Sequence, residues 1–230
     1  AGTTAAGAVS STGGSGGGVF LGGTSKMTIG SGSLSNNKAR GTTSYGNGAG
    51  IYVDTSAELT LAGGSVSTNE SIAASQSNGG TALGAGIYTK GTVNVTGNFT
   101  VSGNTTNRYG AGIYLKRGTI TISSGKTLTV NGKNSAGQYG GGIVVNNDST
   151  NGASITGDGG LTVSGNTATS GGGGIYMDGT TADGVINVKG AVDISSNSTG
   201  GSGGGLAIVG SKASFAPTGA VNIKSNTATI

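Results

Sequence analysis

Short runs in which apolar and polar residues alternate recur along the whole chain. Residues 51–53, 59–61 and 93–95 read IYV, LTL and VNV, with an apolar residue at every second position. A period of two over a short run is typical of a β-strand that buries one face. The pattern therefore predicts many short strands, and no amphipathic helix is evident at either end of the chain.

A glycine-rich triplet followed by an aliphatic residue marks the start of each repeat. The aliphatic residues are Val19, Ile51, Ile87, Ile113, Ile143, Ile175 and Leu206. Successive members are 32, 36, 26, 30, 32 and 31 residues apart. An imperfect period near 31 residues indicates a repeat architecture that tolerates insertions.

An asparagine forms a second mark in every repeat. These residues are Asn37, Asn69, Asn104, Asn134, Asn166, Asn197 and Asn226. Six of them follow an aliphatic residue by three positions, and Asn134 follows Val130 by four. Two gaps between an asparagine and the next triplet are long, and we interpret residues 38–47 and 70–83 as loop insertions.

Each period holds three short strands that cannot bury themselves alone. Stacked coil on coil, they would form parallel sheets around a narrow apolar core. Because parallel crossovers are nearly always right-handed, we predict an all-β, right-handed parallel β-helix. It would have about seven three-strand coils of roughly 31 residues, occupy residues 1–230 as one domain, and measure roughly 34 Å at ~4.8 Å per coil.

The composition alone is typical of a disordered chain. Glycine accounts for 52 residues, and glycine, serine, threonine and asparagine together for 132 of 230, or 57%. Such a chain ordinarily lacks a core. In the predicted fold, glycine adopts positive φ at tight corners, and asparagine tolerates the left-handed region. Stacked asparagine side chains also form hydrogen-bonded ladders, which we predict for the seven repeat asparagines.

Several function classes are disfavoured by the residues that are missing. There is no cysteine, histidine or tryptophan, so thiolate metal sites and histidine-based catalysis are excluded, and we expect no metal or cofactor. The net charge of +4 is spread out, which argues against nucleic-acid binding. No apolar run is long enough for a membrane span. Asp54 and Asp178 share a column but lie four coils apart, so we predict no enzyme activity.

Outward-facing positions of the first strand form an aromatic column. Its aromatic members are Phe20, Tyr52, Tyr88, Tyr114 and Tyr176. Stacked rings stiffen a sheet, or, as an exposed stripe, they could bind glycans or dock a subunit. Columns of threonine on the other strands are similar to those of ice-binding proteins, but asparagine and Asp193 interrupt them, and threonine is a good strand former.

The two ends of the chain suggest continuation. Residues 11–18 are identical to residues 198–205, so residues 1–15 read as the remnant of a preceding coil or as an inter-subunit segment. The uncapped ends of a β-helix expose unpaired backbone N–H and C=O groups at the sheet edges. We therefore expect either adjoining coils of a longer chain or end-to-end self-association into a filament.

The two marks together resemble the β-helix repeats of bacterial surface proteins. Polymorphic outer-membrane proteins and related autotransporter adhesins carry a G-G-A-I motif and an aromatic-x-x-N motif once per coil. Here the first appears as the glycine triplets, and the second as an aliphatic version such as residues 163–166, VSGN. The resemblance implies a secreted, extracellular or cell-surface, non-enzymatic adhesin or structural module. A carbohydrate-active or glycan-binding β-helix protein is the alternative, with surface glycans as partners.

Overall fold

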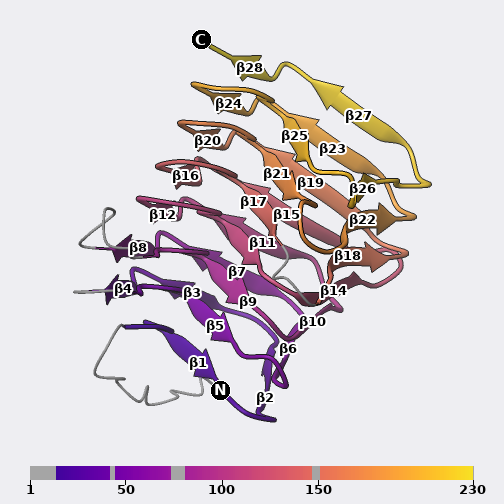
Figure 1. Cartoon of the computed structure of the whole chain (residues 1–230). Coiled ribbons are helices and arrows are strands. Elements are labelled where there is room, and N and C mark those ends of the chain that lie inside the picture. Colours follow the sequence, from indigo (N-terminus) through magenta and orange to yellow (C-terminus); the bar gives the residue numbers. More distant parts are fainter. Residues whose placement is uncertain (1–13, 42–44, 74–80, 147–150, 230) are drawn as a thin grey trace.

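The computed structural model describes residues 14–41, 45–73, 81–146 and 151–229. All regular structure there is β, arranged as four parallel sheets of seven strands each. The chain passes through the four sheets in turn and then returns to the first sheet one layer higher (Figure 1). The seven stacked coils, about six full turns from the first strand to the last, form a parallel β-helix, as predicted.

The first two sheets carry the strands that follow the glycine triplets. Sheet one consists of β1 (Val19–Leu21), β5 (Ile51–Val53), β9 (Ile87–Thr89), β13 (Ile113–Leu115), β17 (Ile143–Asn146), β21 (Ile175–Asp178) and β25 (Leu206–Val209). Sheet two consists of β2 (Lys26–Ile29), β6 (Glu58–Leu61), β10 (Thr92–Val95), β14 (Gly118–Ile122), β18 (Ala153–Gly157), β22 (Gly184–Val188) and β26 (Ala213–Phe215).

The other two sheets lie on either side of the asparagine positions. Sheet three consists of β3 (Ser33–Ser35), β7 (Gly64–Ser67), β11 (Phe99–Ser102), β15 (Thr127–Asn131), β19 (Gly160–Ser164), β23 (Val192–Ser195) and β27 (Val221–Lys224). Sheet four consists of β4 (Lys38–Gly41), β8 (Glu70–Ala73), β12 (Thr105–Thr106), β16 (Ser135–Ala136), β20 (Thr167–Ala168), β24 (Ser198–Thr199) and β28 (Thr227–Ala228).

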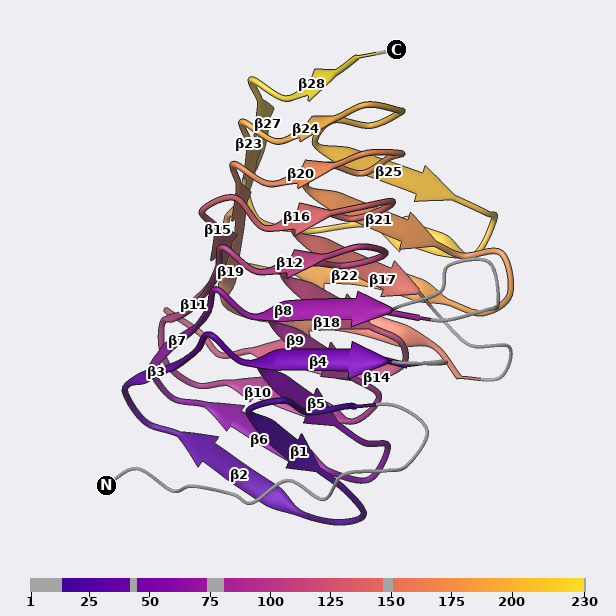
Figure 2. The same ribbon diagram turned by 90° about the vertical axis from the view of Figure 1, so that its left-hand side faces the viewer.

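Sheet four corrects the prediction of three strands per coil. Its strands run along one side of the rod, where β4 and β8 lie in front in Figure 2. The predicted insertions 38–47 and 70–83 were wrong at their starts, because residues 38–41 and 70–73 are β4 and β8. Residues 42–44 and 74–80 of those insertions lie outside the described residues, as do residues 1–13 of the predicted 1–15 remnant.

A column of left-handed residues shapes the corner before each asparagine. The residue that precedes the asparagine has positive φ in every coil: Asn36, Thr68, Gly103, Lys133, Gly165, Ser196 and Ser225. In the fourth coil Gly132 is left-handed as well. This additional corner residue explains why Asn134 follows Val130 by four positions rather than three.

The two sequence marks pack against each other. A Cβ on Gly174, the last glycine of its triplet, would lie 2.5 Å from the carbonyl oxygen of Gly205 and 2.8 Å from Nδ2 of Asn197. Such contacts are too short for any side chain. The triplet therefore ends in glycine because the neighbouring coil and the asparagine side chain both occupy the space that a Cβ needs.

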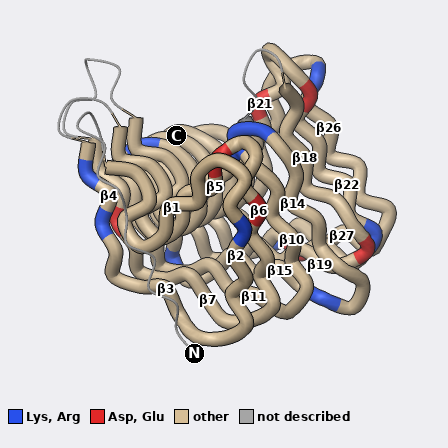
Figure 3. Tube along the Cα trace, turned by 90° about the horizontal axis from the view of Figure 1, so that it is seen from below, with Lys and Arg blue, Asp and Glu red and all other residues tan. Residues whose placement is uncertain are grey.

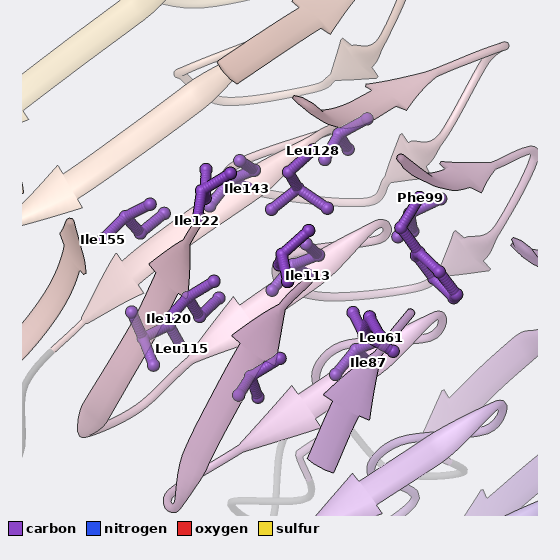
Figure 4. Close-up of a cluster of buried hydrophobic side chains, with 14 of the residues drawn as sticks. Leu61, Ile87, Phe99, Ile113, Leu115, Ile120, Ile122, Leu128, Ile143 and Ile155 are labelled. Carbon is purple, nitrogen blue, oxygen red and sulfur yellow. The ribbon is translucent and has the colours of Figure 1, made fainter. Parts of the chain in front are cut away.

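The core is a continuous apolar column inside the coils. Inward-facing residues of sheets one, two and three form one buried cluster, and Figure 4 shows side chains from successive coils pointing into the same interior. Phe99 is fully buried and pairs in register with Gly64 of the coil below. The ring thus lies beside a position without a side chain, which keeps the local volume nearly constant.

Candidate functional site

The seven repeat asparagines form the predicted ladder. Nδ2 of each of the first six donates a hydrogen bond to Oδ1 of the asparagine one coil higher, which gives six successive links of 2.8–3.0 Å from Asn37 to Asn226. The five asparagines between the two ends are at most 1% exposed. The ladder prediction is confirmed, and the role of the ladder is structural.

Each interior asparagine also satisfies groups of the main chain. In the fifth coil, Nδ2 of Asn166 donates to the carbonyl oxygen of Val130 at 3.0 Å, and its backbone N–H donates to Oδ1 of Asn197 at 3.0 Å. One side chain thus pairs with donors and acceptors in the coils below and above. This satisfaction makes a buried amide tolerable in an apolar rod.

The aromatic column of sheet one is stacked but largely covered. Ring centroids are 4.9 Å apart for Phe20 and Tyr52, 4.9 Å for Tyr52 and Tyr88, and 5.7 Å for Tyr88 and Tyr114. Tyr88 and Tyr114 are each only 4% exposed. The prediction of an exposed stripe is therefore wrong for these two residues. Phe20 is exposed, whereas Tyr52 and Tyr176 are half-buried.

The covering residues come from the segments that lead into the glycine triplets. Leu83 belongs to the same apolar cluster as Tyr88 and Tyr114, and Tyr109 packs against that cluster. Leu83 and Tyr109 are themselves bridged one coil apart. These segments form a second column beside the first, and a single strand pattern gives no sign of that arrangement.

The second column shifts toward the first in the upper half of the rod. The Tyr109 and Tyr139 rings stack at 5.8 Å. The next position above Tyr139 in its own column is Gly171, and the Tyr139 ring instead lies 4.6 Å from Tyr176, tilted by 35°. The first column has Val144, not an aromatic residue, directly below Tyr176. The smaller side chain leaves room for this crossing.

A hollow of about 170 Å³ opens at the crossing. It is lined by Tyr109, Tyr139, Val144, Tyr176 and Asp178. Burial, followed by the nearby Asp178 charge, raises the pKa of Tyr176 above its ordinary value. Thr180 donates two hydrogen bonds to Oδ1 of Asp178, from its backbone N–H at 3.0 Å and from its hydroxyl at 2.7 Å. Three aromatic rings and an oriented carboxylate therefore share one recess.

A lower coil shows the same kind of residues with a cation in place. Lys90 Nζ lies 2.7 Å from Oδ1 of Asp54 and 5.4 Å from the centroid of the Tyr52 ring. Burial opposes ionisation of Asp54, but hydrogen bonds from Lys90 and Thr55 outweigh it and lower the pKa of the carboxyl. The pKa of Lys90 is raised, since its bonds to Asp54 and Tyr52 outweigh burial.

Other carboxylates pair with cations of an adjacent coil. Lys26 pairs with Glu58 at 2.7 Å, Lys38 with Glu70 at 3.0 Å, and Lys189 with Asp158 at 2.8 Å. Charged residues lie around the outside of the coil in the axial view of Figure 3. These contacts are ion pairs between neighbouring coils.

Asp54 and Asp178 do not form the close carboxylate pair that glycoside hydrolysis needs. The register places four coil steps between Ile51 and Ile175. Asp54 and Asp178, three residues beyond them, are therefore about 19 Å apart at ~4.8 Å per step, too far for an acid and a nucleophile. No cluster of three potential metal ligands occurs among the described residues either.

The last coil differs from the others in its burial. Val221 and Ile223 are 44% and 50% exposed, and Ile208 and Val209 are 47% and 41% exposed. Asn226 receives hydrogen bonds from Asn197, and its Nδ2 donates to the carbonyl oxygen of Ile194. Apolar side chains and strand edges are thus open at the upper end of the described structure.

Comparison with known proteins finds no matching family, no matching characterised protein and no matching solved structure. Among the residues that the structure describes, no helix has the length and hydropathy needed to cross a lipid bilayer. Function is therefore argued from the geometry of this chain.

Proposed function

We propose that the chain is a non-enzymatic structural module of an extracellular, adhesin-like β-helical rod, in which a further coil covers the last one. The covering coil is either the continuation of a longer rod or the first coil of a second copy in a filament. The resemblance to bacterial adhesin repeats supports the surface location, and the sparsely charged, threonine-rich exterior suits such a location.

The exposed last coil carries this proposal. Val221 and Ile223 pair in register with Val192 and Ile194, which are 1% and 0% exposed. An added coil would bury the outer pair in the same way. The main-chain groups of β25, β26, β27 and β28 that point away from the lower coils would then find partners, and an asparagine above Asn226 would extend the ladder.

Crosslinking tests the filament form. Ser33 and Asn222 occupy the same outward column in the first and last coils. In a head-to-tail stack, their Cα atoms would lie about 4.8 Å apart, which suits a disulfide. The chain has no cysteine, so the double variant Ser33→Cys/Asn222→Cys should give a ladder of oligomers on a non-reducing gel.

The matched control moves one cysteine out of register. Ser33→Cys/Lys224→Cys moves the second thiol two residues along the same strand, so the two Cα atoms would lie about 8 Å apart in the stack, beyond the reach of a disulfide. Equal ladders from the two variants, or none from either, would reject the filament form.

Extension of the chain tests the longer-rod form. A second copy of residues 202–230 joined after residue 230 continues the repeat, since Thr199 pairs with Ala228. We expect a higher melting temperature, because the added coil buries Val221 and Ile223 of the original last coil and adds one more interface between neighbouring coils. An appended coil that stays unfolded, with unchanged melting, would contradict this form.

A further inference from the structure

A built-in ammonium site in the second and third coils provides a template. There the ammonium of Lys90 is held by the carboxylate of Asp54 and lies over the Tyr52 ring. Tyr52 and Asp54 are two residues apart, so their side chains leave the same face of the strand. An aromatic ring and a carboxylate at this spacing therefore bind an ammonium group in this fold.

The sixth coil repeats the two binding residues. Tyr176 and Asp178 occupy the columns of Tyr52 and Asp54, as the register of sheet one shows. Asp178 is also oriented by a following threonine, as Asp54 is by Thr55. The carboxylate and the ring thus occupy the same two columns in both places.

The cation is what the sixth coil lacks. Lys90 comes from the coil above Asp54, and the equivalent residue above Asp178 is Val209. Within the described ranges, no lysine or arginine forms an ion pair with Asp178. Lys212, from the same upper coil, instead donates to the carbonyl oxygen of Thr181. The charge of Asp178 is therefore left for a group outside the chain.

The surroundings of Asp178 add what the template does not have. Tyr109 and Tyr139 line the hollow together with Tyr176. The Tyr139 ring packs against both of the others, and the Arg108 guanidinium lies 5.5 Å from the centroid of the Tyr109 ring. Tyr176 is therefore the ring that offers a face beside Asp178. All three tyrosines are half-buried. A positive group that enters the hollow would exchange water for an aromatic face while keeping a carboxylate partner.

We propose that the hollow formed by Tyr109, Tyr139, Tyr176 and Asp178 binds an organic ammonium cation. Asp178 neutralises the cation, and the Tyr176 ring lies beside it as Tyr52 lies beside Lys90. Amino sugars, lysine side chains and choline-type headgroups all carry this chemistry, and the proposal concerns the charge that they share. The site lies on the side of the rod, so it is independent of any docking at the last coil.

The direct test is an NMR titration of the ¹⁵N-labelled protein with three probes: choline, glucosamine and N-acetylglucosamine. Choline carries a quaternary ammonium and glucosamine a protonated amine, whereas the acetylated sugar is neutral. We expect saturable shifts around Tyr139, Tyr176 and Asp178 with at least one of the two cations, and none with N-acetylglucosamine. Raising the salt concentration should weaken the binding.

Two variants locate the binding group. Asp178→Asn retains an acceptor for Thr180 but removes the charge, and it should weaken binding about tenfold or more. Asp183→Asn is the matched control, because Asp183 is an exposed acid on the same connection and its loss changes the net charge equally. Its affinity should equal that of the unmodified chain.

A third variant restores the internal cation. Val209→Lys recreates the arrangement of Lys90 over Asp54, and the new ammonium should occupy the hollow and abolish binding of the probes. Ser214→Lys adds the same charge at an exposed position on another sheet of the same coil, and it should leave binding nearly intact. Circular dichroism checks that every variant remains folded.

Three results would overturn the proposal. The first is that neither cation gives a saturable shift. The second is equal binding of N-acetylglucosamine and glucosamine, which would make the hollow a stacking platform for neutral sugars. The third is unchanged affinity in folded Val209→Lys or Asp178→Asn.

Discussion

Neighbouring strands β23 and β27 have the same pattern but opposite environments. Val192 and Ile194 of β23 are 1% and 0% exposed, whereas Val221 and Ile223 of β27 are 44% and 50% exposed. The two strands pair residue by residue. The difference shows that a coil of this rod does not bury its own apolar residues, because much of their burial comes from the coils on either side.

Alanine substitutions at the paired isoleucines should show the largest difference in stability between the interior and the end of the rod. Ile194→Ala leaves a cavity in the closed core and should lower the free energy of unfolding by about 2–5 kcal/mol. Ile223→Ala removes a half-exposed side chain and should cost less than about 1 kcal/mol. Urea unfolding followed by circular dichroism measures both. Equal losses would mean that the last coil is covered in solution.

The asparagine ladder offers a second contrast between interior and end. Asn166→Ala removes the acceptor of Asn134 Nδ2 and the donor to Val130 and Asn197, leaving buried groups unpaired. We expect a loss of about 2–4 kcal/mol. Asn226→Ala should cost less than about 1 kcal/mol, because water reaches the half-buried upper rung and replaces its bonds.

Amide hydrogen exchange tests the same pair of substitutions locally. Asn166→Ala should accelerate exchange in the coils on both sides of the fifth coil, whereas Asn226→Ala should affect the last coil alone. Spread of the Asn226→Ala effect to the middle of the rod would contradict the view that coupling runs only between neighbours.

Alkaline pH should destabilise the chain mainly through the buried tyrosine Tyr88 of the aromatic column. Burial, followed by the neighbouring rings of Tyr52 and Tyr114, raises the pKa of Tyr88 well above its ordinary value. The unfolded chain therefore releases this proton first, near pH 10. Stability is complete below that pH and should fall above it by about 1.4 kcal/mol per pH unit.

Phenylalanine variants identify the group that is responsible. Tyr88→Phe should remove most of the alkaline loss in melting experiments between pH 9 and 11. Tyr176→Phe should remove less, because the Tyr176 ring is half-buried near the open end. If Tyr88→Phe melts with the pH dependence of the unmodified chain, the burial of Tyr88 does not control it.

The exposed ion pairs should show the smallest effect. Side chains of Lys189 and Asp158 are 71% and 55% exposed, so solvent screens their attraction. Asp158→Asn should change the free energy of unfolding by no more than about 0.5 kcal/mol in the same urea experiment. A much larger loss would show that exposed ion pairs, as well as apolar burial, stabilise the contact between neighbouring coils.

The repeat marks predicted the fold and the ladder because both follow from local and periodic rules. Sheet four was missed because its inward positions are small, for example Ala39, Ser71 and Ala136, and such residues give no apolar signal. The alternation that predicted outward tyrosines was correct about direction. It could not predict that Leu83 and Tyr109 would cover Tyr88 and Tyr114.

The sequence by itself determined the period, the strand faces, the corners and the asparagine column, since each depends on residue type at a fixed spacing. Only the tertiary structure decided which outward rings are buried and where the aromatic columns cross. It also decided which carboxylate has a cation above it. These properties depend on loops and on pairs of residues about 30 positions apart, such as Asp178 and Val209, which become neighbours only when the coils stack.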